Sequence, residues 1–229
     1  MSVTSRCIPR LTSDRELYSS MEIPAGKGNR NEVTCTWIGT AGLCISDSVT
    51  GILVDPYVSR FSIGAVALRR PLIPDLALVR EWSQRLGGVS IRAVIVSHSH
   101  FDHAADAPYF TRETGALLVG SESTLNIGRG AGLEEKRMRL AEPGRMMKFG
   151  YFSVEFIESL HGPFLFGRVP YSGDIREPLM PPGTATDYRV GTVFSLRVRH
   201  RAGTLLHHGS AGFINGMYDR ITTDVILMG

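Results

Sequence analysis

Four potential metal ligands stand close together in the segment SHSHFDH, residues 97–103. His98 and His100 are two positions apart, so in an extended chain their imidazoles point the same way and can bind one ion. A helix that starts near Asp102 would present Asp102 and His103 to the same crevice from a second direction. A lone histidine is usually a surface or capping residue, but chance rarely produces so dense a cluster. The segment therefore predicts a metal site, and neutral imidazole suits Zn²⁺.

A third ligand must come from elsewhere in the chain, because catalytic zinc sites use three protein ligands and leave one position for water. His161 is the natural choice, since it follows an apolar strand expected over residues 149–157. As a single histidine it also has an ordinary structural alternative. Zinc lowers the pKa of a bound water from about 15.7 to about 7. Asp102 is the expected catalytic residue: it would orient that water and accept its proton, or bind a second ion.

The elements that must position these groups follow from hydrophobic patterning. Residues 91–96 form an apolar run directly before the cluster, which is typical of a buried strand. Strand carboxyl ends are where open α/β sheets place their ligands. A helix is expected over residues 76–86, and residues 61–74 favour a packed loop. Further strands are expected over residues 33–38, 43–46, 52–54, 117–119 and 138–140.

The later part of the chain combines a long loop with more strands. Residues 162–191 are rich in proline and glycine, and long loops are often functional. Residues 192–198 and 204–206 predict a hairpin, and residues 224–228 predict a buried strand. We expect a loosely ordered leader over residues 1–31 and one domain over residues 32–229. The chain ends within a strand pattern, which favours a domain truncated at its C-terminus.

Composition excludes several classes of protein. The 229 residues are 43% apolar and 21% charged, which is unlike a disordered chain. No apolar run approaches the roughly 18 residues of a membrane span, and the first 20 residues do not resemble a secretory signal. Three cysteines are too few for a disulfide framework, which favours the cytoplasm. The net charge of +3 is small, so nucleic acid is an unlikely partner.

The motifs together resemble the metallo-β-lactamase-fold hydrolases. SHSHFDH is similar to the signature of that family, and residues 36–42 and 51–56 resemble the opening strands of its ascorbate-6-phosphate lactonase-like branch. The resemblance implies an α/β fold, an αββα sandwich, with a metal site at the sheet edges. It further implies that His98, His100 and His161 bind a first metal ion. Asp102 and His103 would belong to a second site.

Three departures from the family pattern concern the second metal. The family supplies a bridging aspartate from a Gly-Asp turn after a late strand, where this chain has Ser210; Asp174, in the long loop, is the other candidate. No histidine follows His208, although the family has one near its C-terminus. Thr40 replaces a histidine often found in this branch. The sequence leaves open whether one or two ions bind.

Several other residues have simpler interpretations. His207 and His208 are adjacent in a strand, so one is expected to line the site wall and the other to be exposed. His200 stands among arginines, so it is expected to belong to a solvated basic turn. Trp37 predicts a core residue.

The expected function is a metal-dependent hydrolase that uses a zinc-activated water on a small ester, lactone, amide or phosphoester. One or two Zn²⁺ ions are expected, with Mn²⁺ or Fe²⁺ as alternatives. A catalytically impaired metal-binding remnant of such a hydrolase is the second hypothesis. A nucleic-acid-processing enzyme is the third, and the small positive charge argues against it. The expected partner is a small-molecule substrate, and the sequence does not predict an oligomeric state.

Overall fold

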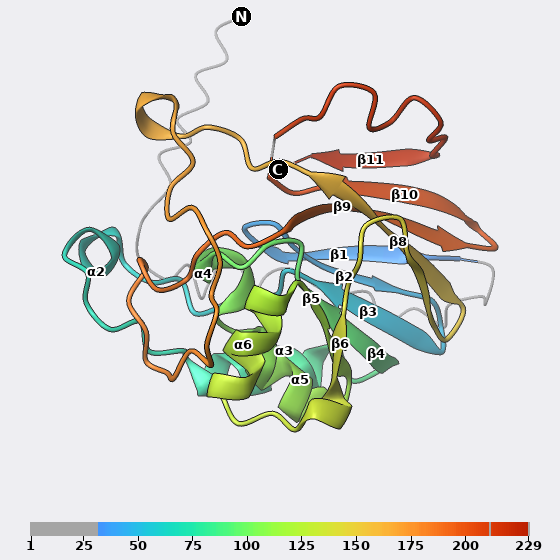
Figure 1. Ribbon diagram of the computed structural model, residues 1–229. Helices are drawn as coiled ribbons and strands as arrows, with labels where there is room; N and C mark the ends of the chain where they lie inside the picture. The colour runs from blue at the N-terminus through green and yellow to red at the C-terminus, as the bar shows by residue number, and fades with distance from the viewer. Residues whose placement is uncertain (1–31, 211, 229) are drawn as a thin grey trace, which may run out of the picture.

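Two β-sheets pack face to face in the computed structural model, which describes residues 32–210 and 212–228 (Figure 1). The six-stranded sheet, sheet A, has the order β1-β2-β3-β4-β5-β6, and the five-stranded sheet, sheet B, has the order β11-β10-β9-β8-β7. The strands of sheet A are β1 (Thr34–Gly39), β2 (Gly42–Ser46), β3 (Thr50–Val54), β4 (Ser90–Ile95), β5 (Leu117–Gly120) and β6 (Met138–Leu140). Those of sheet B are β7 (Met146–Phe149), β8 (Phe152–Ser159), β9 (Val193–His200), β10 (Gly203–His208) and β11 (Val225–Met228).

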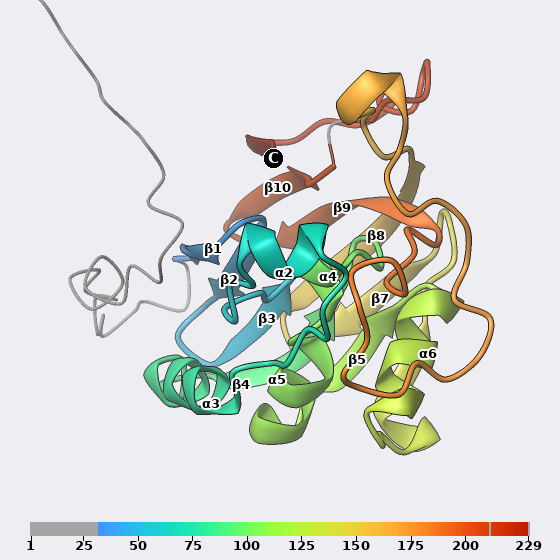
Figure 2. The ribbon, with the colours of Figure 1, turned by 90° about the vertical axis from the view of Figure 1, so that its left-hand side faces the viewer.

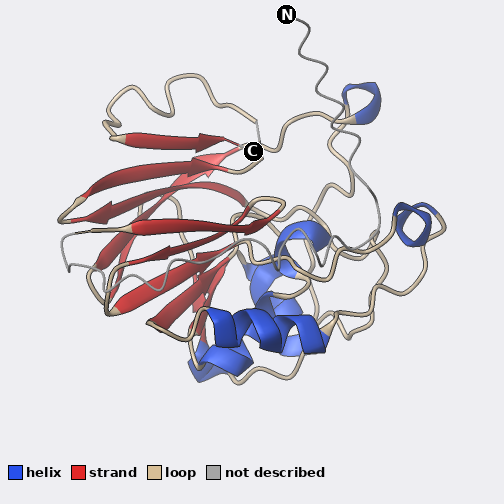
Figure 3. Cartoon of the chain, turned by 180° about the vertical axis from the view of Figure 1, so that it is seen from behind, coloured by secondary structure: helices blue, strands red, loops and turns tan. Residues whose placement is uncertain are grey.

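Helices cover the outer face of sheet A. The described α-helices are α2 (Ile63–Ala67), α3 (Leu76–Arg85), α4 (Phe101–Ala104), α5 (Ala107–Thr114) and α6 (Glu122–Gly130), with short 3-10 turns η1 (Glu135–Arg137) and η2 (Leu165–Gly167). Strands β3 to β6 are parallel, so each connection must cross over, and α3, α5 and α6 lie in these crossovers. Figure 3 shows these helices gathered against one side of the strands.

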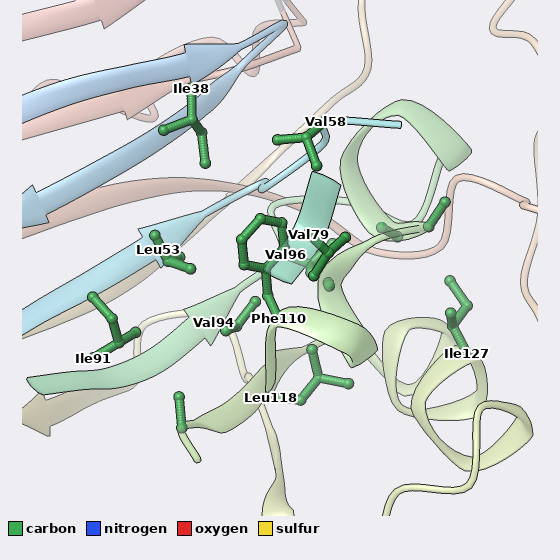
Figure 4. Packing of buried hydrophobic residues seen from close by; sticks show 14 of the residues in the cluster. Ile38, Leu53, Val58, Val79, Ile91, Val94, Val96, Phe110, Leu118 and Ile127 are labelled. Atoms are coloured by element: carbon green, nitrogen blue, oxygen red, sulfur yellow. The ribbon is translucent and has the colours of Figure 1, made fainter. Parts of the chain in front are cut away.

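Sheet A is buried on both faces, which divides the apolar core into two layers. Between the helices and sheet A, Phe110 of α5 packs among side chains that include Leu53 and Val94 (Figure 4). Between the two sheets, the inward-facing residues of β8, among them Phe152 and Phe156, meet those of the other strands. This explains why β3 and β4 are almost uniformly apolar while β8 alternates.

The predicted strands of sheet A and the hairpin of β9 and β10 are present, and the fold-class prediction of an α/β sandwich is confirmed. The described residues show one helical layer followed by the two sheets. The sequence analysis did not predict β7, α5 or α6, and α2 lies in the segment expected to be a loop. The expected leader lies outside the described residues, and the domain boundary at residue 32 stays a prediction.

Two expectations of burial were wrong for the same reason. Trp37 is 43% exposed, and three of the four β11 residues are exposed. Trp37 lies on β1 and Val225 begins β11, and these are edge strands of their sheets. An edge strand has a neighbour on one side only, so apolar composition alone does not bury it.

The turn between β2 and β3 depends on a carboxylate. Asp47 Oδ1 accepts hydrogen bonds from the backbone N–H groups of Val49 (2.7 Å) and Thr50 (2.6 Å). Burial opposes ionisation, but these hydrogen bonds and nearby His200 hold the pKa of Asp47 below its usual value. Because the folded pKa is lowered, this stabilisation is present above about pH 4 and is lost as the pH falls through the folded pKa.

We predict that Asp47→Ala lowers the free energy of unfolding by about 1–2 kcal/mol at pH 7, because two backbone donors lose their acceptor. The difference from wild type should narrow below pH 4. Urea unfolding at pH 7 and at pH 3 measures both values. Ser48→Ala, in the same turn, is the matched control and should have little effect. A difference that widens at low pH would contradict this account.

Candidate metal centre

Three segments from different parts of the fold meet at one end of the two sheets. Residues 97–100 leave β4, α4 follows them directly, and His161 lies just beyond the end of β8. Helices α2 and α4 face the viewer in Figure 2, together with the orange segment that follows β8. The carboxyl end of β4 therefore delivers its histidines to the edge at which β8 also ends.

Three imidazoles gather there. One ring nitrogen from each of His98, His100 and His161 lies within 4.8 Å of the others. Their ring centroids are 4.7 to 4.9 Å apart. Shifts of less than about 1 Å per ring would bring the three nitrogens to the Zn–N distance of about 2.1 Å. Among the described residues, this is the group of side chains that could hold a metal ion.

Hydrogen bonds at the far side of each ring determine which nitrogen is free. The carbonyl of Pro170 can only accept, so His100 donates to it from Nε2 (2.9 Å) and keeps the lone pair on Nδ1. In the same way His161 donates from Nδ1 to the carbonyl of Gly162 (2.6 Å), which leaves Nε2 free. A carbonyl acceptor of this kind fixes the tautomer that a metal-binding histidine needs.

His98 is oriented through a serine. Ser97 Oγ donates its only hydrogen to Asp55 Oδ2 (2.6 Å), so it must accept from His98 Nδ1 at 3.2 Å. The lone pair of His98 is then on Nε2, which is buried and has no hydrogen-bond partner. A buried nitrogen without a partner is costly in a folded protein, and a metal ion would satisfy it.

The carboxylate of Asp55 contacts both Ser97 and His103, behind the three imidazoles. Asp55 is fully buried at the end of β3, and it also accepts from the backbone N–H of Ser97 (2.6 Å). His103 Nδ1 lies 3.0 Å from Asp55 Oδ2. Burial would raise the pKa of Asp55, but His103 outweighs it and the pKa is lowered. Asp55 therefore links the exits of β3 and β4 to the first turn of α4.

Burial and mutual proximity keep the imidazoles of His98 and His100 neutral. Burial and the neighbouring histidines lower the pKa of His98 well below its usual value. Burial and then His161 lower the pKa of His100 to about 4. For His103 burial acts in the same direction, but the carboxylates of Asp55 and Asp102 outweigh it and raise the pKa. Neutral imidazole is the form that binds metal, so His98 and His100 are in the required state at neutral pH.

Asp102 and His103 lie on α4 beside the triad, as the spacing predicted. The ring of His103 is 3.9 Å from that of His98, and its Nε2 is 4.0 Å from Asp102 Oδ2. Asp102 is half-buried, with its side chain 37% exposed, and it lines a cavity. Asp102 thus combines proximity to the histidines with access to solvent.

The cavity has a volume of about 630 Å³ and opens beside the histidines. His100, His161 and Asp102 line one part of it. Val66 of α2 and the loop after β8 line the rest. A site of this size accommodates a small molecule next to the three imidazoles.

The structure separates the two candidates for the bridging position. Ser210 lines the same cavity as His161 and Asp102, whereas Asp174 is exposed and lines a different hollow.

The loops after β8 and β10 are joined where Gly162 N–H donates to the Ser210 carbonyl (2.6 Å). A Cβ atom at Gly212 would lie 1.9 Å from the carbonyl oxygen of Leu160, so only glycine permits this approach.

Of the three remaining histidines, His207 lies in the kind of environment predicted for one of the pair, whereas His208 and His200 do not. His207 faces inward, is buried, and interacts electrostatically with Asp55 and His103. His208 is also buried, so the prediction that one of the pair is exposed was wrong; its Nδ1 lies 2.6 Å from the hydroxyl of Tyr218. His200 does not lie in a solvated turn, because its side chain is 3% exposed and lies 3.4 Å from Asp47.

Sequence reasoning missed Asp55 and Ser97 as parts of the site, and it did not decide which of His207 and His208 lines the wall. The sequence analysis included Asp55 only in the segment 51–56 and Ser97 only as the first residue of the SHSHFDH segment. The position of Asp55 could have been used to find it. Asp55 follows an apolar strand directly, and so does the histidine cluster. The carboxyl ends of neighbouring parallel strands lie at the same edge of a sheet. Nothing in the local sequence points from His207 to Asp55, because the two lie on different sheets.

Comparison with protein families gives one match, which covers most of the described chain. The profile of the Metallo-beta-lactamase superfamily matches residues 50–222. A UPF0173 metal-dependent hydrolase of Myxococcus xanthus is 26% identical over 189 residues, covering 82% of this chain and 56% of that protein. Another, from Pyrobaculum islandicum, is 30% identical over 115 residues, covering 50% of this chain and 44% of that protein. The chain spans about half the length of the curated relatives it matches.

Two solved structures resemble this chain at low sequence identity. A mutant of CmlA beta-hydroxylase is 15% identical, with a TM-score of 0.50, and covers 85% of this chain and 34% of that chain. The metallo-beta-lactamase fold protein YhfI from Bacillus subtilis is also 15% identical, with a TM-score of 0.46, and covers 81% of this chain and 61% of that one. At this level of identity the likeness concerns the fold alone.

We predict that Asp55→Asn lowers the free energy of unfolding of the metal-free chain by about 3 kcal/mol, because Ser97 and His103 lose a buried charged partner. Asparagine tolerates the positive φ of 46° at this position, so backbone strain does not contribute to the change in the free energy of unfolding. Urea unfolding measures the loss. Asp102→Asn is the control, since it also approaches His103 but is half-exposed, and should cost under about 1 kcal/mol. Equal losses in the two variants would refute the role given to Asp55.

Proposed function

The chain belongs to the metallo-beta-lactamase superfamily, and on that basis we propose that it hydrolyses a small molecule with a bound divalent metal ion. The observation that carries the proposal is the convergence of His98, His100 and His161, with one ring nitrogen of each within 4.8 Å of the others. The curated relatives named above are metal-dependent hydrolases, which supports the same reaction class.

The residues present fit a metal ion. The far-side partners leave lone pairs on His98 Nε2, His100 Nδ1 and His161 Nε2, and the first of these is buried without a hydrogen-bond partner. Three imidazoles, each with a free ring nitrogen, form a donor set that suits Zn²⁺. A bound divalent ion would supply Lewis acidity and lower the pKa of a water molecule to about 7. We propose zinc, with iron or manganese as alternatives.

Asp102 is the proposed catalytic residue. Its carboxylate lines the cavity beside His100 and His161, and its side chain is 37% exposed, so it can reach both solvent and a substrate. In that place it can orient a water molecule and accept its proton. His103, 4.0 Å from Asp102, is the second residue proposed for a further metal ion. Asp55 and Ser97 act behind the histidines and hold their orientation.

The cavity supports a small-molecule substrate: an ester, lactone, amide or phosphoester of a size that fits about 630 Å³. None of the helices in the described part of the chain has the length and apolar character needed to cross a lipid bilayer. The cytoplasmic location stays a prediction that rests on the three cysteines of the sequence, of which Cys35 and Cys44 are free thiols.

The second candidate function, a metal-binding remnant without turnover, is favoured by one observation. Ser210 lines the cavity where the family resemblance leads us to expect an aspartate, and serine carries no negative charge. A site with fewer anionic ligands holds two cations less well. The number of bound ions therefore separates a complete site from an impaired one.

We predict that His98→Ala and His100→Ala each remove metal and hydrolytic activity together, because each deletes one of three ligands. Asp102→Asn should reduce turnover at least 100-fold while changing metal content much less. Metal analysis of the purified protein and hydrolysis of 4-nitrophenyl acetate and bis(4-nitrophenyl) phosphate test this. His200→Ala, remote from the cavity, is the control. Wild-type protein that is active without zinc, iron or manganese would end the proposal, and bound metal without turnover would favour the remnant.

We further predict that Ser210→Asp raises the number of zinc ions bound per chain, because it adds a carboxylate to the cavity wall near Asp102 and His161. Titration with zinc followed by metal analysis gives the stoichiometry. Asp174→Asn is the matched control and should leave the stoichiometry unchanged, since Asp174 lines a separate hollow. A loss of zinc in Asp174→Asn would instead place that aspartate in the site.

A further inference from the structure

The cavity beside the three histidines is lined by a polar set and an apolar set of residues. His100, Asp102 and His161 form the polar set. Most of the remaining wall is apolar: it includes Val66 of α2, Phe101 of α4, and Phe164 and Pro170 of the loop after β8. Groups that bind only water and a metal ion do not need such a wall. The wall suits the body of an apolar molecule whose reacting group lies near the histidines.

One cation interrupts the apolar wall. Arg168 is the single arginine or lysine among the described residues that line the cavity. No carboxylate of the described residues lies within ion-pair distance of it, in contrast to Arg129 and Arg145, which pair with nearby glutamates. The single acidic residue on the wall, Asp102, belongs to the polar set and lies 4.0 Å from His103. Arg168 is therefore available to an anion that enters the cavity.

The entrance is apolar on two sides. Helix α2 contributes Val66 to the wall, and next to that helix Leu68 is 66% exposed. On the loop after β8, Phe164 is 70% exposed and Phe166 is 96% exposed. Figure 2 shows α2 and this orange loop at the same end of the molecule. Single exposed apolar residues are ordinary, but Leu68 and Phe166 each lie two residues along the chain from a residue of the cavity wall, Val66 and Phe164.

We propose that the substrate is an amphipathic anion: an ester, lactone or amide with an aromatic or alkyl body and one carboxylate or other monoanionic group. The anionic group pairs with Arg168, and the apolar body contacts Val66, Phe101 and Phe164. The bond to be cleaved then lies between these contacts and the histidines. Calling this ligand a substrate rests on the proposed hydrolytic function. The binding preference itself is a property of the cavity and can be measured without turnover.

Two related dyes test the proposal on the full chain loaded with zinc. 1-Anilinonaphthalene-8-sulfonate is an aromatic monoanion, and N-phenyl-1-naphthylamine is its uncharged counterpart. Fluorescence titration gives the dissociation constant of each dye. Arg168→Gln should weaken binding of the anionic dye by about 5- to 10-fold and leave the uncharged dye unchanged. Arg176→Gln, an exposed arginine that lines a separate hollow, is the matched control and should change neither.

A second pair of variants locates the dyes in the cavity. Phe164→Ala should weaken both dyes by several-fold, because it removes apolar wall. Tyr151→Ala is the control: Tyr151 is also exposed but precedes β8, at the end of that strand remote from His161, and should have no effect. Equal loss in the two variants would show that the dyes bind elsewhere and would overturn the proposal.

The outcomes separate this inference from the proposed function. If Arg168→Gln leaves the anionic dye unchanged, or weakens both dyes equally, the anionic preference is wrong even when hydrolysis is found. If the charge-selective effect appears but the wild-type chain holds metal without hydrolysing any ester or phosphodiester, the preference stands and the hydrolase proposal fails.

Discussion

The site depends on one buried carboxylate. Asp55 is completely removed from solvent, and a charge in that position is tolerable only when it is paired and hydrogen-bonded. Its partners are the backbone and hydroxyl of Ser97 and the ring of His103. The same requirement that stabilises Asp55 therefore fixes how the chain leaves β4. Ser97 also accepts a hydrogen bond from His98, so the burial of a charge at the end of β3 sets the tautomer of a proposed metal ligand just after β4.

The second half of the site comes from the other sheet, and close backbone packing aligns it. His161 follows β8 and Ser210 follows β10, strands that are not adjacent in sheet B because β9 lies between them. A hydrogen bond from Gly162 to the Ser210 carbonyl and the near-contact at Gly212 bring their loops together. The position of His161 is thus set by backbone contacts, which leave its side chain free to meet those of His98 and His100.

The parts of the site that could be predicted are those with local causes. The i, i+2 spacing of His98 and His100 and the strand before them follow from chain geometry, so the cluster could be located from the sequence alone. Long-range causes were not visible. His200 looked solvated among arginines, yet it packs on Phe152 and approaches Asp47. Trp37 looked like core, yet β1 is an edge strand. Both errors arise because composition reports polarity but does not specify which neighbours a strand has.

The replacement of an expected aspartate by Ser210 and the presence of Arg168 have the same electrostatic consequence. Each makes the cavity more positive than a wall with two carboxylates would be. Imidazole ligands carry no negative charge that would offset a divalent ion, and Asp102 is the single carboxylate that lines the described cavity. Like charges close together repel strongly in a partly desolvated site, so the arrangement disfavours a second cation. The same excess of positive charge would attract an anionic substrate, so the proposed weakening of the second metal site and the proposed preference for anions have one physical cause.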